Sequence, residues 1–404
     1  MLDYQSVDLQ GDKQHSAFFH EYLEKIYQQR QESQLDENIL AIHHMLVQVA
    51  PQTSAAYIAE LLLSTPYKYS ESYTDKQFIY HILQIDPECP DLLVREPLGN
   101  CEIDIVHLNM LAQTSRKHPQ VRYIGEVFNV SDLQAVYKQL HDKQAVLFES
   151  TPDQLKPQEV LWTQASVFTH NHYGYIQDPQ NSRQYFRLAD WEFSAEDLAK
   201  FKLAKDMFNN YDLHKYLLPI DHFATRVYCH DREHAILEFL SLAPYYFWGA
   251  YNIGDQNSST NVCRHIQGER EFKSPAKVFT ANNTPFYTNH IDQLPSPTEN
   301  FVRAYGRRLH HIAFAVKDGF IGPEENNYRN VDFVVDQLKK AHMQFLDHVI
   351  GSCAEGLKQI FSEKSRYSLL ITEYIQRCDN FDGFFTKENV AALTKAAGKD
   401  DLIT

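Results

Sequence analysis

The stretch Arg308-Leu309-His310-His311-Ile312-Ala313-Phe314-Ala315-Val316 decides how the rest of this chain is interpreted. It opens on a histidine pair and continues as an apolar run, which predicts a buried β-strand. A second apolar run, residues 369–377, carries a single carboxylate, Glu373. A buried glutamate is costly unless a partner stabilises its charge, and a divalent cation is an effective partner. We therefore interpret the two strands as parts of a metal site.

Similar strand openings occur elsewhere in the chain. Residues 41–49 and 219–227 also place a histidine ahead of apolar residues, and a weaker copy lies at residues 121–127. Helical apolar spacing follows two of the openings, at residues 130–140 and 331–341. The chain therefore repeats a unit of one strand, one helix and several further strands, a βαβββ pattern, four times.

These repeated units predict the domain organisation. A single unit cannot bury its apolar faces alone, so units pair, and two pairs make two domains. We predict an α+β fold in which each domain is a curved, open mixed sheet or barrel with helices outside. The predicted divisions are an N-terminal extension at residues 1–36, a first domain at 37–193 and a second at 194–404. A helix is expected around residues 18–29, and a ligand on a concave sheet face.

The composition narrows the possible partners. The chain has 404 residues, and its 53 acidic and 38 basic residues leave a formal charge of −15, which repels phosphate backbones and anionic lipid surfaces. Neither nucleic acid nor a membrane is expected as a partner, and no signal-peptide pattern opens the chain. We expect a cytoplasmic homo-oligomer with reduced thiols, because no CxxC pair or regular cysteine framework is present. The six cysteines are Cys89, Cys101, Cys229, Cys263, Cys353 and Cys378.

The expected metal ligands are His222, His311 and Glu373. Two imidazoles and one carboxylate form the set that holds non-haem Fe(II) on one face and leaves positions open for substrate and oxygen. In paired units the opening strands lie near the pseudo-twofold axis, so the two histidines can face each other while Glu373 completes the triangle. His310 precedes His311 and, on a strand, should point to the opposite face. We choose His311 because, like His222, it stands one place before an apolar pair, Ile312-Ala313 in one case and Phe223-Ala224 in the other.

The N-terminal half lacks an equally complete set. His43-His44 stands at an equivalent opening, but the expected closing strands, residues 102–107 and 166–170, offer no clear matching carboxylate. We interpret this half as a degenerate copy that keeps the fold and supports the interface. The run His170-Asn171-His172 is interpreted as a polar strand end or turn.

Four segments carry a resemblance to a known family: Ile220-Asp221-His222, residues 311–316, residues 356–361 and Glu373-Tyr374-Ile375-Gln376-Arg377. With them, the span from about residue 217 to 393 resembles the catalytic domain of 4-hydroxyphenylpyruvate dioxygenase, in the vicinal oxygen chelate superfamily. That family holds Fe(II) through residues matching His222, His311 and Glu373. The resemblance implies an enzyme of aromatic amino acid catabolism that uses O2 to decarboxylate and hydroxylate an aromatic 2-oxo acid.

The resemblance also implies residues that contact the substrate. Gln359 matches a glutamine of the family's pocket, and Asn289 lies where the family has an asparagine in a Pro-x-Asn segment. Phe384 and Phe385 match the region of a glycine-flanked phenylalanine that precedes a closing C-terminal helix.

The polar lining of the family's pocket is changed at Ala276 or Lys277, at Tyr287 and within residues 297–300. A changed lining selects a different ring or acid, so 4-hydroxyphenylpyruvate and a related 2-oxo acid both stay open as substrates. Two other functions stay open as well: an extradiol ring-cleaving dioxygenase with the same ligand set, and a non-catalytic protein that binds a small aromatic ligand. The residues after Glu373 and the phenylalanine-containing lid favour the 2-oxo acid enzyme over the extradiol one.

Overall fold

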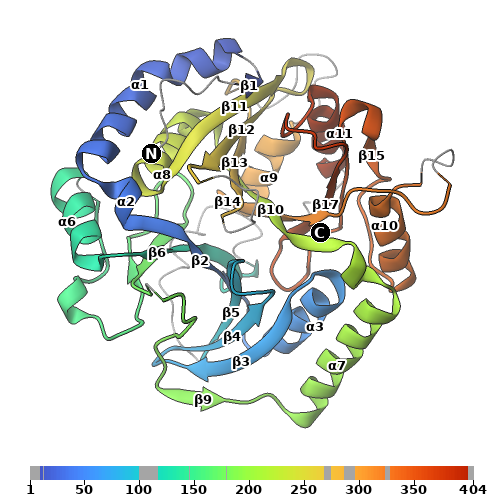
Figure 1. The fold of residues 1–404 in the computed structure, drawn as a ribbon, viewed down its shortest axis with the longest axis horizontal. Helices are drawn as coiled ribbons and strands as arrows, with labels where there is room; N and C mark the ends of the chain where they lie inside the picture. Colours follow the sequence, from blue (N-terminus) through green and yellow to red (C-terminus); the bar gives the residue numbers. More distant parts are fainter. Residues whose placement is uncertain are drawn as a thin grey trace.

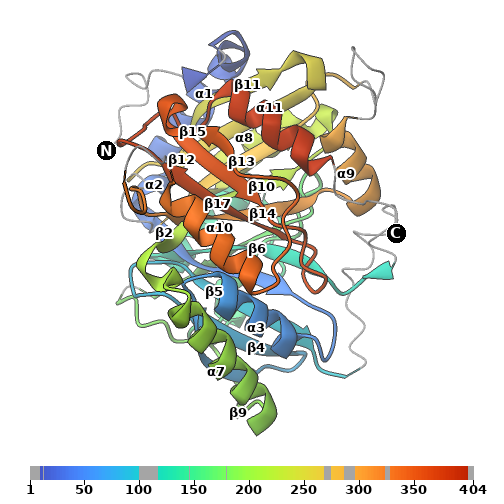
Figure 2. The ribbon, with the colours of Figure 1, turned by 90° about the vertical axis from the view of Figure 1, so that its right-hand side faces the viewer.

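The structure is a computed structural model that describes residues 10–11, 13–99, 117–144, 146–178, 180–267, 274–285, 296–323 and 328–398. Within these residues the strands form two mixed sheets, which lie one above the other in Figure 2. The first sheet has the order β7 (Leu161–Trp162), β8 (His172–Ile176), β6 (Arg122–Val130), β2 (Ile39–Gln48), β5 (Asp91–Pro97), β4 (Phe78–Gln84), β3 (Lys68–Thr74), β9 (Ala189–Trp191). The second has the order β1 (Gln10–Gly11), β11 (Tyr245–Ile253), β12 (Ser258–His265), β13 (Ala276–Ala281), β10 (Leu217–Arg226), β14 (Arg308–Val316), β17 (Ile371–Arg377), β16 (Leu357–Phe361), β15 (Ile350–Ser352).

Helices surround both sheets in Figure 1. Their bounds are α1 (Lys13–Glu32), α2 (Leu35–Asn38), α3 (Ser54–Ser64), α6 (Leu133–Gln144), α7 (Ala195–Asn210), α8 (Arg232–Leu242), α9 (Pro297–Tyr305), α10 (Asn330–Lys340) and α11 (Lys387–Ala397). In the described part of the chain, none of these helices combines the length and apolar character that crossing a membrane requires.

The order of the elements confirms the α+β fold built from paired units. The first, third and fourth units run β2-α3-β3-β4-β5, β10-α8-β11-β12-β13 and β14-α10-β15-β16-β17. The second runs β6-α6-β7-β8, with an isolated bridge between Phe148 and Thr163. Paired units meet through their opening strands, because β2 pairs antiparallel with β6 and β10 with β14.

One of the two closing strands expected in the first sheet is a turn in the structure. Residues 166–170 form a turn, not a strand, with the His170 amide donating to the Ser166 carbonyl at 2.9 Å, and the strand begins at His172. The turn requires a left-handed backbone at His170, where φ is 59°, a conformation that a continuous strand excludes. The other expected strand, residues 102–107, lies outside the described residues.

The fourth unit shows how local sequence sets these elements. All nine residues of β14 are buried, as its apolar run requires. The next helix, α10, buries Val331, Val334 and Leu338, which lie at helical spacing. Its first turn is tied to the sheet because the Val331 amide donates to Gln376 Oε1 on β17 at 2.9 Å. The helix therefore covers the outer face of the sheet and leaves the other face open.

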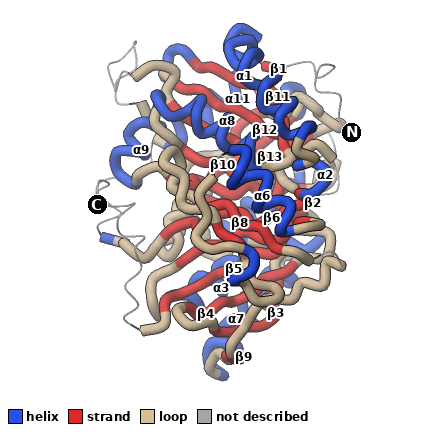
Figure 3. Tube along the Cα trace, turned by 90° about the vertical axis from the view of Figure 1, so that its left-hand side faces the viewer, coloured by secondary structure: helices blue, strands red, loops and turns tan. Residues whose placement is uncertain are grey.

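One apolar core joins the two halves. It contains Ile58 of α3, Phe239 of α8, Phe128 of β6 and Phe314 of β14, together with residues from the other outer helices. Figure 3 views the side of the molecule on which α6 and α8 lie. Because the helices and this core cover one face of each sheet, the opposite, concave faces are lined by separate, smaller clusters.

The N-terminal extension packs on the second sheet, although it precedes the first in sequence. Its strand β1 pairs in parallel with β11, and the Phe247 amide of β11 donates to the Tyr27 hydroxyl of α1 at 2.8 Å. The helix expected around residues 18–29 is present as α1. Helix α7 follows directly after the predicted boundary at residue 193, and Ser194 caps it by accepting from the Asp197 amide. The division of the chain into separate domains at this boundary stays a prediction.

Candidate metal centre

Three adjacent strands bring His222, His311 and Glu373 together on the concave face of the second sheet. His222 on β10 and Glu373 on β17 both stand opposite Ala313 of β14. The Nε2 atoms of the two histidines are 3.3 Å apart, and each lies 3.2 Å from Glu373 Oε2. The ligand atoms of His222, His311 and Glu373 all lie within 4.8 Å of one another, and among the described residues no other group of three candidate ligands is this compact.

The electrostatics of this triangle suit a cation. Glu373 is fully buried, and neither carboxylate oxygen has a hydrogen-bond partner within the described structure, despite the two nearby imidazoles. A buried carboxylate without hydrogen bonds is strongly destabilising unless a positive charge compensates for it. Three sets of lone pairs that converge on one point are also the donor arrangement that a divalent transition metal requires.

The two histidines have different charge environments. Burial lowers the pKa of His222, but the Glu373 and Asp221 carboxylates outweigh this effect and raise the pKa to about 9. Burial, together with the neighbouring His222 and Arg226, holds the pKa of His311 well below its usual value. A metal binds neutral imidazole, so a metal bound here at neutral pH would displace a proton from His222, whereas burial already favours the neutral form of His311.

His222 is oriented by a chain of contacts that ends in the C-terminal segment. A register irregularity between Ile220 and His222 accompanies a 2.8 Å hydrogen bond from His222 Nδ1 to Asp221 Oδ1. Arg377 clasps the same carboxylate, from Nε at 3.0 Å and from Nη2 at 2.8 Å, and its Nη1 donates to the Phe384 carbonyl. Such outer contacts fix the tautomer and the direction of a ligating ring.

His311 is oriented by its neighbour, and here the strand geometry differs from the sequence-based expectation. Ala224 pairs with His311 but Thr225 pairs with Leu309, so His310 is an extra residue in β14. This bulge interrupts the strict alternation of faces. The prediction that His310 points to the opposite face is therefore wrong, since its Nδ1 lies 2.7 Å from His311 Nδ1. With Nε2 of His311 directed to the centre, His310 holds the proton-bearing side of the ring.

Aromatic rings close the space around the triangle. The ring centroids of Phe384 and Phe385 lie 5.7 and 5.3 Å from that of His222, and Phe361 lies 4.9 Å from His311. The cavity beside His311 and Glu373 has a volume of only about 40 Å³. A larger cavity of about 720 Å³ lies against Phe384 and the Asp221–Arg377 pair. The two phenylalanines therefore stand at the approach to the triangle.

Of the predicted substrate-binding residues Gln359 and Asn289, only Gln359 lies within the described residues. Gln359 on β16 is fully buried, and both polar atoms of its amide lack a hydrogen-bond partner within the described structure. It pairs with Ile375, two positions beyond Glu373 on the same strand, so Gln359 and Glu373 share the concave face. Asn289 lies outside the described residues. Sequence reasoning missed the supporting roles of Asp221, His310 and Arg377, although all three stand beside predicted ligands or inside quoted segments.

The first sheet shows why the N-terminal half lacks this centre. His44 stands opposite Val127 and then Gly174, the register that His222, Ala313 and Glu373 occupy in the second sheet. The position equivalent to His311 is Gly125, where a Cβ would meet the His172 carbonyl oxygen at 1.9 Å. Two of the three ligand positions are therefore glycines, and one of them has no room for a side chain.

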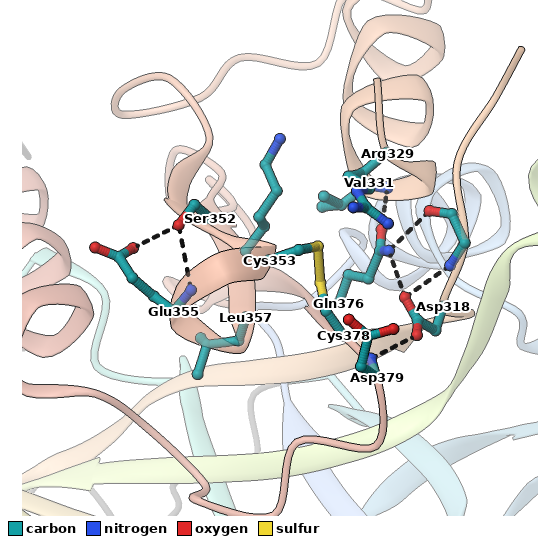
Figure 4. Close-up of a disulfide and its surroundings, with 12 residues drawn as sticks. Asp318, Arg329, Val331, Ser352, Cys353, Glu355, Leu357, Gln376, Cys378 and Asp379 are labelled. Atoms are coloured by element: carbon teal, nitrogen blue, oxygen red, sulfur yellow. Dashed lines mark hydrogen bonds between the residues drawn. A yellow bond between two sulfur atoms is a disulfide. The ribbon is translucent and has the colours of Figure 1, made fainter. Parts of the chain in front are cut away.

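A disulfide lies beside the segment that follows Glu373. Cys353 and Cys378 are bonded, with their Cα atoms 5.3 Å apart (Figure 4). The expectation that every cysteine is a reduced thiol is therefore wrong for this pair, because β16 and β17 bring together residues that are distant in sequence. Cys89, Cys229 and Cys263 are free, and Cys101 lies outside the described residues. Disulfides are uncommon in the cytosol, so this pair does not favour the predicted cytoplasmic location.

The two sheets of paired βαβββ units form a fold that is shared with solved structures. A mutant of 4-hydroxymandelate synthase from Streptomyces coelicolor superposes with a TM-score of 0.59 and 16% identity, over 89% of this chain and 98% of that chain. A xylose isomerase-like TIM barrel/4-hydroxyphenylpyruvate dioxygenase fusion protein gives a TM-score of 0.51 and 14% identity, over 93% of this chain and 57% of that chain. At identities this low, the structural similarity shows a shared fold alone. No protein-family model and no curated protein matches the sequence.

Proposed function

We propose that this protein is a non-haem Fe(II)-dependent dioxygenase that decarboxylates and hydroxylates an aromatic 2-oxo acid. The convergence of His222, His311 and Glu373 on one buried point is the observation that carries the proposal. The solved structures named above support it, because their names describe a 4-hydroxymandelate synthase and a 4-hydroxyphenylpyruvate dioxygenase. A bound Fe(II) would supply a chelation site for the 2-oxo acid and the means to activate O2.

The side chains around the centre have distinct parts in this proposal. Gln359 would bind a polar atom of the substrate, since a buried amide without partners gains most from a ligand that satisfies it. Phe384 and Phe385 would pack on the aromatic ring and exclude water from the reacting atoms. Because the cavity of about 40 Å³ is too small for an aromatic acid, these two residues and α11 would move to admit it.

The proposal is tested by oxygen uptake. The protein is loaded anaerobically with Fe(II), mixed with a panel of aromatic 2-oxo acids, and exposed to oxygen while O2 consumption and CO2 release are recorded. At least one 2-oxo acid should give stoichiometric uptake and release, and should produce a visible charge-transfer band before oxygen is admitted. If no acid of the panel gives either signal on iron-loaded protein, the proposal is wrong.

Matched variants assign the activity to the centre. His311→Ala should abolish both the charge-transfer band and oxygen uptake, whereas His348→Ala changes an exposed histidine and should leave both intact. A panel of catechols run in parallel separates the remaining enzyme class. Ring cleavage of a catechol, with all 2-oxo acids inert, would identify an extradiol dioxygenase instead.

A further inference from the structure

The first sheet has a concave cavity of its own. Its volume is about 710 Å³, and its lining includes His44, Tyr73, Tyr80, Arg95, Trp162 and Tyr185. This volume falls in the range of cavities that hold small organic molecules. We propose that this cavity is a second ligand site, for a small aromatic carboxylate, and that it is independent of the metal centre.

The geometry of the sheet excludes a metal of the kind proposed for the second half. His44 keeps the position equivalent to His222, but Gly125 and Gly174 replace the other two ligands. With no ligand side chains at these two positions, the concave face keeps its shape but has lost the charged centre. The space that remains is suited to an organic molecule rather than to an ion.

Aromatic rings form one wall of the cavity. Tyr73 and Tyr80 stack with centroids 5.0 Å apart and an interplanar angle of 7°, and Tyr185 continues the stack at 6.0 Å from Tyr73. His44 meets Tyr185 edge-on at 5.3 Å. Rings held by each other in this way form a rigid apolar surface, on which a planar ligand can pack at little cost in side-chain entropy.

Arg95 supplies a positive charge in the same cavity. Its Nε donates to Gln48 Oε1 at 3.0 Å and its Nη1 to the Tyr80 hydroxyl at 3.4 Å, while the guanidinium lies 3.9 Å above the Phe78 ring. These contacts are all with neutral groups, so within the described chain Arg95 has no carboxylate partner. A guanidinium that is held in place but lacks an anion is a ready site for a carboxylate.

Two other arginines of this half show the contrast. Arg183 pairs with Asp91 at 3.2 Å, and Arg187 pairs with Glu71 at 2.7 Å while also lying 5.2 Å from the Tyr73 ring. Their charges are compensated inside the protein. Arg187 is therefore a matched control for Arg95, because it packs against the same tyrosine stack but already has an anion.

Carboxylates at the cavity wall affect which aromatic acid binds best. Asp75 accepts from the Tyr80 hydroxyl at 2.9 Å, and Glu149 lies 3.3 Å from His172 Nδ1. These groups repel a plain anion and attract an ammonium group. An aromatic amino acid should therefore bind more tightly than the corresponding 2-oxo acid or the acid without an amino group.

Binding is measured by calorimetry and tryptophan fluorescence on the metal-free full-length protein, so that chelation at the other centre does not contribute. The probes are L-phenylalanine, phenylpyruvate, 3-phenylpropanoate and phenethylamine, the last of which lacks a carboxylate. L-phenylalanine should bind most tightly, the two acids more weakly, and phenethylamine at least tenfold more weakly than L-phenylalanine. If none of the three carboxylates binds, or if phenethylamine binds as well as they do, the proposal is overturned.

Variants locate the bound molecule. Arg95→Gln should weaken L-phenylalanine binding at least tenfold, and Arg95→Lys, which keeps the charge, should weaken it less; Arg187→Gln should retain wild-type affinity. His311→Ala should also retain it, because it alters only the second sheet. Binding that survives in both Arg95 variants and disappears in His311→Ala would place the ligand at the metal centre and refute the second site.

Discussion

Removing the hydrogen bond between His222 and Asp221 should weaken metal binding at the candidate centre. Asp221→Asn keeps an oxygen that can accept from His222 Nδ1, so the ring direction survives, but it removes the charge that faces both His222 and Arg377. Asp221→Ala removes the hydrogen bond as well. Loss of an outer partner of a metal-binding histidine typically weakens metal affinity by about 10- to 100-fold.

We expect the metal affinities of the two variants to fall at the two ends of that range. For Asp221→Asn we expect about tenfold weaker binding, or about 1.4 kcal/mol, because only the charge is lost. For Asp221→Ala we expect about a hundredfold, or about 2.8 kcal/mol, because orientation is lost too. The Asp221–Arg377 pair is largely buried, with side chains 11% and 22% exposed, so solvent screens this interaction only in part.

Anaerobic calorimetry with Co(II), a more oxidation-resistant substitute for Fe(II), measures these affinities. Asp318→Asn is the control, because Asp318 accepts from Gln376 Nε2 at 2.9 Å and from the Asp379 amide at 2.8 Å in the neighbouring loop (Figure 4), without contacting His222. It should bind Co(II) as the wild type does. Wild-type affinity in both Asp221 variants, with the fold intact by circular dichroism, would refute the assigned role of this hydrogen bond.

Three further predictions concern stability. Co(II) at about 100 times its dissociation constant should stabilise the folded protein by about 2.7 kcal/mol in thermal unfolding, an effect that Glu373→Gln should largely remove and whose absence in the wild type would argue against the centre. Burial raises the pKa of Glu60 from 4.5 to about 7; the folded state then holds the proton more tightly than the unfolded state, so stability falls as pH rises between these values. In urea titrations at pH 8, Glu60→Gln should therefore be more stable than the wild type by up to about 3 kcal/mol, and equal pH slopes would contradict this reasoning. Cys353→Ser removes the disulfide between residues 25 apart in sequence and should lower the free energy of unfolding by about 3.5 kcal/mol. A reductant should destabilise the wild type by the same amount and leave the stability of the variant unchanged.

Sequence patterns were sufficient for the fold, and for finding the three side chains that converge at the candidate centre, because both depend on periodic or chemically costly residues. The apolar run of β14 and the spacing of Val331, Val334 and Leu338 in α10 follow directly from strand and helix geometry. Glu373 could be singled out because an acidic residue inside an apolar strand requires compensation wherever that strand packs. The repeated openings then indicated which histidines could face it.

What the sequence could not determine depends on contacts between distant segments or on small departures from ideal strands. The bulge that turns His310 toward His311 is one extra residue in a pairing register, which exists only once β10 and β14 are aligned. The Cys353–Cys378 bond and the Asp221–Arg377 pair form because tertiary packing brings separate segments into contact. The sequence thus determined which residues must be buried, whereas the packing of the strands decided which of them meet, because register and bulges depend on the partner strand as much as on the strand itself.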